Sequence, residues 1–295
     1  MTPGKRTLLA LALAGAASGA FAQQRPEDPD TGGKLLLTGG VSQLEGAAGG
    51  GLTPWAVIGG YGSEGQWGGN AFYTRVNVDD YHLDDIGVLV GWNNRVEVSL
   101  SRMRFDTEDV GAALGLGEGY TFTQDTLGVK VRVAGDAVLD SDRAMPQVAV
   151  GVQYKRNDRG DLLRAIGAQD DDGLDLYVSA TKLFLAQGVL LNGTVRFTRA
   201  NQIGILGFGG DRHDGYRPQL EVSAAYLLSP TVAIGAEYRT KPDNLSIAGE
   251  DDWKDVFIAW APNRRVSLTV AYVDLGNIVI RDHQRGVYAS LQVGF

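Results

Sequence analysis

From residue 34 onward, apolar and polar side chains alternate along the chain with a period of two, and almost nothing repeats at a helical spacing. The clearest run is 265–274, in which Val266, Leu268 and Val270 alternate with Ser, Thr and Ala. The runs 230–239 and 189–198 follow the same scheme. Because successive side chains of a strand point to opposite faces, each run predicts a β-strand with one apolar face.

Over the whole chain, this pattern predicts an all-β fold of fourteen strands, most of them close to the length that a tilted strand needs to cross a lipid bilayer. The predicted strands are 34–42, 55–63, 67–77, 83–93, 95–104, 122–133, 145–155, 173–184, 187–198, 217–227, 230–240, 252–261, 264–274 and 286–295.

The connections between these strands alternate in length. Tight turns are predicted at 93–94, 186–187, 229–230 and 262–263, and long segments at 105–121, 156–172, 199–216, 241–251 and 275–285. Short periplasmic turns and long extracellular loops are typical of an antiparallel up-and-down barrel in an outer membrane. The segment 134–144 is an exception, because it is long where a periplasmic turn is due. Strand parity is kept if 34–42 is a wall strand, which gives 14 strands; if the first hairpin folds into the lumen, 12 remain.

The alternative fold is a soluble β-sandwich or a lipocalin-like barrel, whose apolar face points inward to a core. The last strand favours the membrane barrel. Leu291, Val293 and Phe295 share one apolar face that ends on an aromatic residue, which resembles the signal read by the bacterial barrel-assembly machinery. Aromatic residues also fall near strand ends, where interfacial girdles belong: Trp92, Tyr154, Phe184, Phe197, Tyr226, Tyr238, Trp260 and Tyr272.

The N-terminus carries the features of a secretory signal peptide. Lys5 and Arg6 precede an uncharged apolar run, and small residues follow at Ala20 and Ala22. The apolar run is too short for a membrane-spanning helix, so we expect cleavage between Ala22 and Gln23. The predicted organisation is a signal peptide (1–22), an N-terminal periplasmic segment (23–33) and an outer-membrane β-barrel (34–295).

The net charge and the absence of Cys exclude several kinds of binding partner and site. Removing Lys5 and Arg6 from the 27 basic side chains leaves 25 against 35 acidic ones, a net charge of −10. Such an acidic chain is a poor candidate for nucleic-acid binding, which needs basic side chains to neutralise phosphates. The chain has no Cys, which excludes disulfides, thiolate zinc sites and a lipid-modified N-terminus. The expected surroundings are the lipids and lipopolysaccharide of the outer membrane of a Gram-negative bacterium.

A resemblance supports this location. The run from Leu35 to Gly46, the glycine-rich run from Gly49 to Ala56 and the segment from Ala71 to Tyr81 look like the start of a proteobacterial outer-membrane family that is described only as a domain of unknown function. The resemblance is specific in the N-terminal third and looser afterwards. It implies a barrel in the outer membrane, and it brings no substrate or catalytic residue.

No catalytic or cofactor motif is found in the sequence. The three histidines, His82, His213 and His283, fall in or beside predicted extracellular loops, and there is no G-x-S-x-G elbow, so we expect neither an enzyme nor a cofactor. The glycine-rich run 46–51 lacks the Lys-Ser/Thr of a phosphate-binding loop. It could fold inward as a constriction or latch, or form a mobile outer loop, and the plain loop is favoured.

Acidic clusters occur at Asp79–Asp80 with Asp84–Asp85, at Asp170–Asp172 and at Glu250–Asp252. Hard cations prefer such oxygen ligands, but the spacing of a calcium loop is absent, so we predict solvated loop faces and no dedicated metal site. Arginines among these acids could contact lipopolysaccharide phosphates: Arg156, Arg159, Arg164 and Arg212.

Strand parity predicts which charged residues face the lumen, because their neighbours on both sides are apolar and must face lipid. They are Glu97, Lys130, Arg132, Lys155, Asp175, Arg196, Glu221, Glu237, Arg239 and Arg265. A barrel of 14 strands is wide enough to hold water. The function hypothesis is therefore a porin-like channel for small polar or anionic solutes, lined by Arg132, Arg196 and Arg239. The alternative is a structural or surface-interaction barrel, in which these arginines pair with Glu97, Glu221 and Glu237 and occlude the lumen.

Overall fold

The computed structural model describes residues 33–138 and 144–294. The predicted cleavage site between Ala22 and Gln23 and the terminal Phe295 lie outside these residues, as do the signal peptide and nearly all of the segment 23–33. These features stay predictions.

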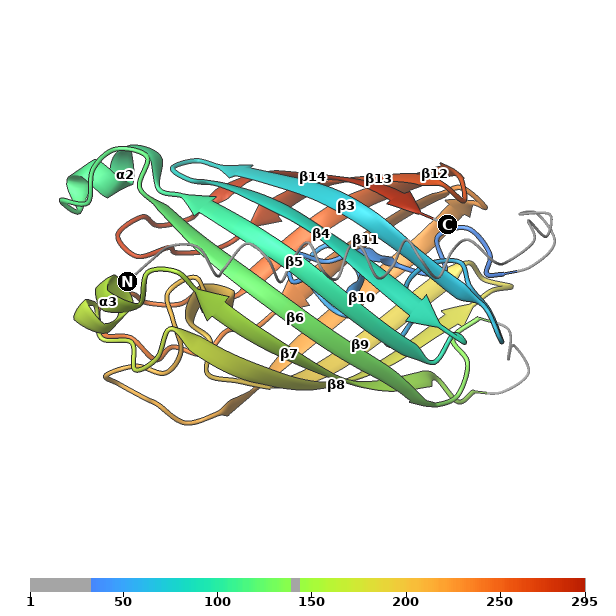
Figure 1. Cartoon of the computed structure of the whole chain (residues 1–295). Helices are drawn as coiled ribbons and strands as arrows, with labels where there is room; N and C mark the ends of the chain where they lie inside the picture. The colour runs from blue at the N-terminus through green and yellow to red at the C-terminus, as the bar shows by residue number, and fades with distance from the viewer. Residues whose placement is uncertain (1–32, 139–143, 295) are drawn as a thin grey trace, which may run out of the picture. The chain divides into compact units, whose positions relative to one another are not determined.

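The described residues form one closed antiparallel barrel of twelve strands, in which neighbours along the chain are neighbours in the wall (Figure 1). The strands are β3 (Trp67–Val78), β4 (His82–Trp92), β5 (Val96–Asp106), β6 (Thr121–Ala134), β7 (Gln147–Asn157), β8 (Asp172–Phe184), β9 (Val189–Thr198), β10 (Arg217–Ser229), β11 (Val232–Arg239), β12 (Trp253–Asn263), β13 (Val266–Asp274) and β14 (Arg285–Gly294). The last strand, β14, pairs with β3 in a register that runs from Gly286–Val78 to Gly294–Asn70. This pairing closes the wall and leaves no free strand edge.

The wall is apolar outside and largely polar inside. On β12 the exposed side chains include Val256, Ile258 and Trp260, and the residues between these three are buried. On β9 the inward positions include Asn192, Thr194 and Arg196, all buried. A soluble barrel has the opposite arrangement, whereas an apolar outer band is what a barrel in lipid requires.

The aromatic residues predicted near strand ends lie on the outer surface. All eight are exposed, and they form two groups at opposite ends of the wall. Trp92, Phe184, Tyr226 and Trp260 lie toward the end with the short turns, and Tyr154, Phe197, Tyr238 and Tyr272 lie toward the end with the long loops. These are the positions of membrane-interface girdles.

One end of the barrel carries short turns and the other carries most of the long loops, with the helices α2 (Glu108–Ala113) and α3 (Gly160–Ala165) (Figure 1). The β4–β5 turn uses Asn93 and Asn94, both with positive φ, which suits the twist of a tight hairpin. Within the described part of the chain, no helix is long and apolar enough to cross a membrane.

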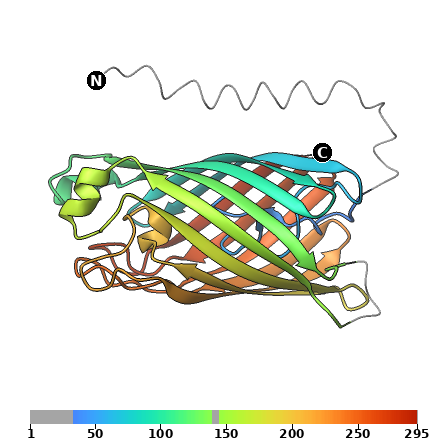
Figure 2. The same cartoon turned by 60° about the horizontal axis from the view of Figure 1, so that its bottom comes forward.

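The alternative of 12 strands is confirmed, and the count of 14 is wrong. The predicted strands 34–42 and 55–63 are not in the wall. The chain from Lys34 to Gly62, which we call the plug, lies largely inside the barrel, with its two ends at the barrel mouth, and Figures 1 and 2 show it in blue. Glycines explain the error. Gly39, Gly40, Gly59 and Gly60 break the alternation, so neither run has an apolar face to present to lipid.

Candidate functional site: the plug and the charges that hold it

The plug folds back on itself in a short hairpin. β1 (Val41–Ser42) pairs with β2 (Ala48–Gly49), and the backbone N–H of Leu44 donates to the carbonyl of Gly51 over 3.1 Å. The turn between the strands needs a positive φ at Gly46, which a glycine adopts without strain. The hairpin thereby points its intervening residues, Glu45 among them, at the barrel wall.

Glu45 is completely buried and forms ion pairs with three different wall strands. Its carboxylate contacts Lys155 of β7, Arg239 of β11 at 2.7 Å and Arg196 of β9 at 3.3 Å. One side chain of the plug therefore binds three wall strands, through residues that lie up to 84 positions apart in the sequence, from Lys155 to Arg239.

Two carboxylates of the wall complete this cluster. Asp175 lies 2.5 Å from Lys155 and 3.2 Å from Arg196. Glu221 lies 2.5 Å from Arg196 and 3.4 Å from Arg239. We call the six residues Glu45, Lys155, Asp175, Arg196, Glu221 and Arg239 the ionic clamp. Its three cations face three carboxylates, and one of the three carboxylates belongs to the plug.

A second attachment lies at Glu97 of β5. Its carboxylate accepts the backbone N–H of Ala48 over 3.0 Å and that of Gly59 over 2.7 Å. It also pairs with Lys130 at 3.1 Å, and Lys130 in turn donates to the carbonyls of Ala48 and Trp55. This pair therefore satisfies both donors and acceptors of the plug backbone.

A third attachment lies at Glu237 of β11. It accepts the backbone N–H of Leu52 over 2.7 Å and the hydroxyl of Thr53 over 2.5 Å. The plug passes so close to it that a Cβ atom on Gly50 would lie 2.0 Å from a Glu237 carboxylate oxygen. Glycine at this position leaves room for the Glu237 carboxylate beside the plug backbone.

Residues 38–292 match the family model described as "Protein of unknown function (DUF3034)". The chain belongs to the DUF3034 family. Among curated proteins, no relative matches it significantly.

Solved structures of outer-membrane barrels resemble this DUF3034 protein. The KdgM porin has a TM-score of 0.50 at 10% identity, with 77% of this chain and 99% of the porin covered. Omp33 of Acinetobacter baumannii has a TM-score of 0.47 at 8% identity, with 79% of this chain and 100% of Omp33 covered. The outer-membrane phospholipase A from Escherichia coli, an enzyme, has a TM-score of 0.42 at 10% identity, with 79% of this chain and 93% of the phospholipase covered. Likeness at such low identity concerns the fold alone.

The structure places eight of the ten predicted lumen residues deep inside the barrel of the DUF3034 protein: Glu97, Lys130, Lys155, Asp175, Arg196, Glu221, Glu237 and Arg239. Arg132 is half-buried and pairs with Asp136 at 3.1 Å. Arg265 is exposed in the turn before β13, where it lines a small pocket at the mouth of the barrel together with Gly40 of the plug and Gln292 of β14.

Two other expectations from the sequence need correction. The run 46–51 is not an outer loop, because it lies in the lumen against Glu237. The arrangement is also not the open, water-filled lumen expected from the sequence, because plug atoms occupy the space in front of Arg196 and Arg239. Sequence reasoning missed Glu45, since the alternation of wall strands assigns no direction to a residue outside the wall.

The loop charges are largely paired with one another. Arg164 contacts Asp161 and Asp171, and Arg212 contacts Asp243 at 2.9 Å. In the part of the chain that the structure describes, no group of three acidic or histidine side chains could hold a metal ion. Contacts of these arginines with lipopolysaccharide stay a prediction.

Proposed function

We propose that this protein is an outer-membrane channel that its own plug closes at rest, and that small polar or anionic solutes pass when the plug is displaced. The ionic clamp carries the proposal. With Glu45 in place, the charges of the clamp balance, whereas without it Lys155, Arg196 and Arg239 face two carboxylates. Displacing the plug would therefore leave an excess positive charge at this level of the lumen, which favours anions.

The chemistry of the attachments favours a removable plug over a permanent core. The clamp and the attachment at Glu97 are charged, and that at Glu237 is polar. Buried ion pairs seldom stabilise a protein more than well-packed apolar residues of the same volume would. The plug also buries apolar side chains, Leu44, Leu52 and Trp55 among them, so apolar and charged contacts hold it together. Charged contacts can exchange their partners for water when the segment moves.

The outward face supports the location. A continuous apolar band between two aromatic girdles suits insertion into an outer membrane. The predicted role of Leu291, Val293 and Phe295 as a signal for the assembly machinery agrees with the exposure of Leu291 and Val293 on the outer face of β14.

A reversible crosslink between plug and wall tests the proposal. The hydroxyl oxygens of Thr53 in the plug and Ser223 of β10 are 2.5 Å apart, and the chain has no Cys. In the double variant Thr53→Cys/Ser223→Cys, a disulfide can form only between these two positions within one chain. The two single-Cys variants are the matched controls.

In planar bilayers, we expect the oxidised double variant to stay closed and the reduced one to show channel openings. The single-Cys variants should respond to neither oxidant nor reductant. Equal conductance of the oxidised and reduced double variant would refute gating by the plug. Absence of conductance in the reduced variant, and also in Glu45→Gln, would support the alternative of a structural barrel with an occluded lumen.

A further inference from the structure

The plug presents two oxygen-bearing groups to neighbouring parts of the barrel wall. One is the carboxylate of Glu45, which the three cations of the ionic clamp bind. The other is the backbone carbonyl of Pro54, which accepts hydrogen bonds from side chains of β8 and β9. The wall therefore has a binding site for a carboxylate and a second one for an uncharged oxygen.

Three wall donors surround the carbonyl oxygen of Pro54. The hydroxyl of Thr194 lies 2.8 Å from this oxygen, the hydroxyl of Ser179 3.2 Å and the amide nitrogen of Asn192 3.4 Å. All three side chains are more than nine-tenths buried. A carbonyl oxygen has two lone pairs, so three donors are more than one peptide group needs. We call Ser179, Asn192 and Thr194 the donor cluster.

The donor cluster and the ionic clamp are adjacent in the wall. Thr194 and Arg196 are both buried on the inner face of β9, two positions apart, so their Cα atoms are separated by about 6.6 Å. The ring of Tyr177 on β8 lies against the Arg196 guanidinium, whose carbon is 5.2 Å from the ring centroid, and it offers a carbon surface there. A solute that spans both sites therefore needs a carboxylate, a short carbon chain and an acceptor oxygen.

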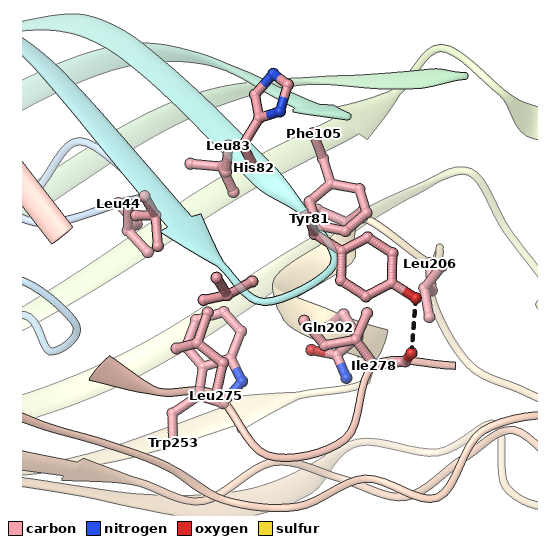
Figure 3. Close-up of a pocket in the computed structure, with 13 residues that line it drawn as sticks. Leu44, Tyr81, His82, Leu83, Phe105, Gln202, Leu206, Trp253, Leu275 and Ile278 are labelled. Carbon is pink, nitrogen blue, oxygen red and sulfur yellow. Dashed lines mark hydrogen bonds between the residues drawn. The ribbon is translucent and has the colours of Figure 1, made fainter. Parts of the chain in front are cut away.

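Plug atoms occupy both sites, so a solute can bind to them only when the plug is displaced. The nearest free space does not change this. Leu44, the neighbour of Glu45, lies at a small cavity that Leu83 and Leu206 also line (Figure 3). The volume of this cavity is about 30 Å³, enough for about two or three water molecules.

We propose that the plug imitates the solute, and that the clamp and the donor cluster together recognise an organic acid with one carboxylate and one uncharged acceptor oxygen several bonds away. The carboxylate would take the place of Glu45, and the acceptor that of the Pro54 carbonyl. Without Glu45, the clamp carries one net positive charge, which a single carboxylate balances. A second carboxylate is disfavoured at the donor cluster, because its donors are neutral. This inference rests on the displacement of the plug in the proposed function, and it specifies the anion.

Hydrogen exchange of the plug in the purified full-length protein measures this binding. A solute that binds only the plug-free lumen multiplies the small released fraction by one plus the ratio of its concentration to its Kd, however tightly the plug is seated. The N–H groups of Leu52 and Gly59 report the release, because they donate to wall carboxylates. The probes are 5-oxohexanoate, hexanoate, which lacks the ketone, and 2-hexanone, which lacks the carboxylate, all at equal ionic strength.

In the wild type, we expect 5-oxohexanoate to accelerate exchange of both N–H groups in proportion to its concentration. Hexanoate should need an about three- to tenfold higher concentration for the same acceleration, which is the range for one lost hydrogen bond. 2-Hexanone should have no effect, and the wall strands should keep their protection. Equal acceleration by hexanoate and 2-hexanone, or no acceleration by any probe, would overturn the site.

Two matched variants test the donor cluster. Thr194→Val removes a donor, and Thr74→Val makes the same change at a buried hydroxyl that bonds to Ser290 of the wall. Each variant is compared with its own exchange without probe, so that a general loosening of the plug cancels. We expect the advantage of 5-oxohexanoate over hexanoate to fall below twofold in Thr194→Val and to persist in Thr74→Val. An advantage of the same size in both variants would refute recognition by the donor cluster.

Arg196→Gln tests the carboxylate site, and it should lose the acceleration by both acids. Full acceleration in this variant would refute recognition by the clamp. The outcome is separable from that of the channel, because no conductance is measured. If the acids release the plug but conductance does not follow its position, the site stands and the channel fails. If the protein conducts but the acids leave the plug seated, only the present inference fails.

Discussion

Glu45→Gln removes one negative charge from the ionic clamp and keeps the shape of the side chain. In the wild type, Glu45 is an ion-pair partner of Lys155, Arg196 and Arg239. In the variant these three cations share only the carboxylates of Asp175 and Glu221. The plug would then lie against a buried excess of positive charge.

The size of the effect follows from this geometry. Removing one partner of a buried ion pair costs about 3–5 kcal/mol, because the other charge stays buried without compensation. The penalty applies only while the plug is seated, since water reaches the arginines once it leaves. At 1.4 kcal/mol per factor of ten, the equilibrium constant for seating should fall about 10²- to 10⁴-fold.

Hydrogen exchange measures that constant directly. The backbone N–H groups of Ala48, Leu52 and Gly59 donate to wall carboxylates, so their exchange reports release of the plug. We expect their exchange to accelerate by the same factor in Glu45→Gln, with unchanged protection in the wall strands. Glu64→Gln is the matched control, because Glu64 is exposed just beyond the plug. Unchanged exchange of the plug in Glu45→Gln would refute the clamp as its main attachment.

Three further predictions concern the plug and the assembly of the barrel. Gly50→Val should weaken the attachment at Glu237, because its Cβ would lie 2.0 Å from a carboxylate oxygen and would turn that side chain away from Leu52; Gly193→Val, where a Cβ meets no atom within 4 Å, should not, and exchange of the Leu52 N–H distinguishes them. Burial lowers the pKa of Lys34 from 10.5 to about 7, so seating of the first plug residues should strengthen as the pH rises from about 7 toward 10; Lys34→Met should abolish this dependence once exchange rates are corrected for pH. Deletion of Phe295 should reduce the amount of protein in outer-membrane fractions, and unchanged levels on immunoblots would contradict its role in assembly.

The wall of the barrel could be predicted from sequence because each wall strand meets the same simple requirement. Lipid outside and a filled lumen inside force an alternation with period two, and that alternation is local. Predicted strands such as 67–77 and 173–184 agree with Trp67–Val78 and Asp172–Phe184 to within a residue at each end. The same parity placed Arg196 and Glu221 inside, although it could not identify their partners.

The plug could not be predicted in this way, because its contacts are distant in sequence. Glu45 meets Lys155 across 110 residues and Arg239 across 194. No periodicity relates positions that far apart. The sequence could not decide between 12 and 14 strands for the same reason. The count depends on whether the first hairpin lies in the wall or in the lumen, and only contacts with distant residues determine that.

The charges inside the barrel explain why the wall needs the plug. Of the eight predicted lumen residues that are buried, four are basic and four are acidic, so the charges of these eight balance in number without the plug. Equal numbers do not mean that every cation has a neighbouring carboxylate. Glu237 accepts hydrogen bonds from Leu52, Thr53 and Ser223, and none of the wall cations is among these partners. The three cations of the clamp are thus left with two wall carboxylates, and Glu45 supplies the third. A closed barrel with these residues is therefore electrostatically complete only with its plug inside, and a form without the plug must hydrate Arg196 and Arg239 or bind an anion there.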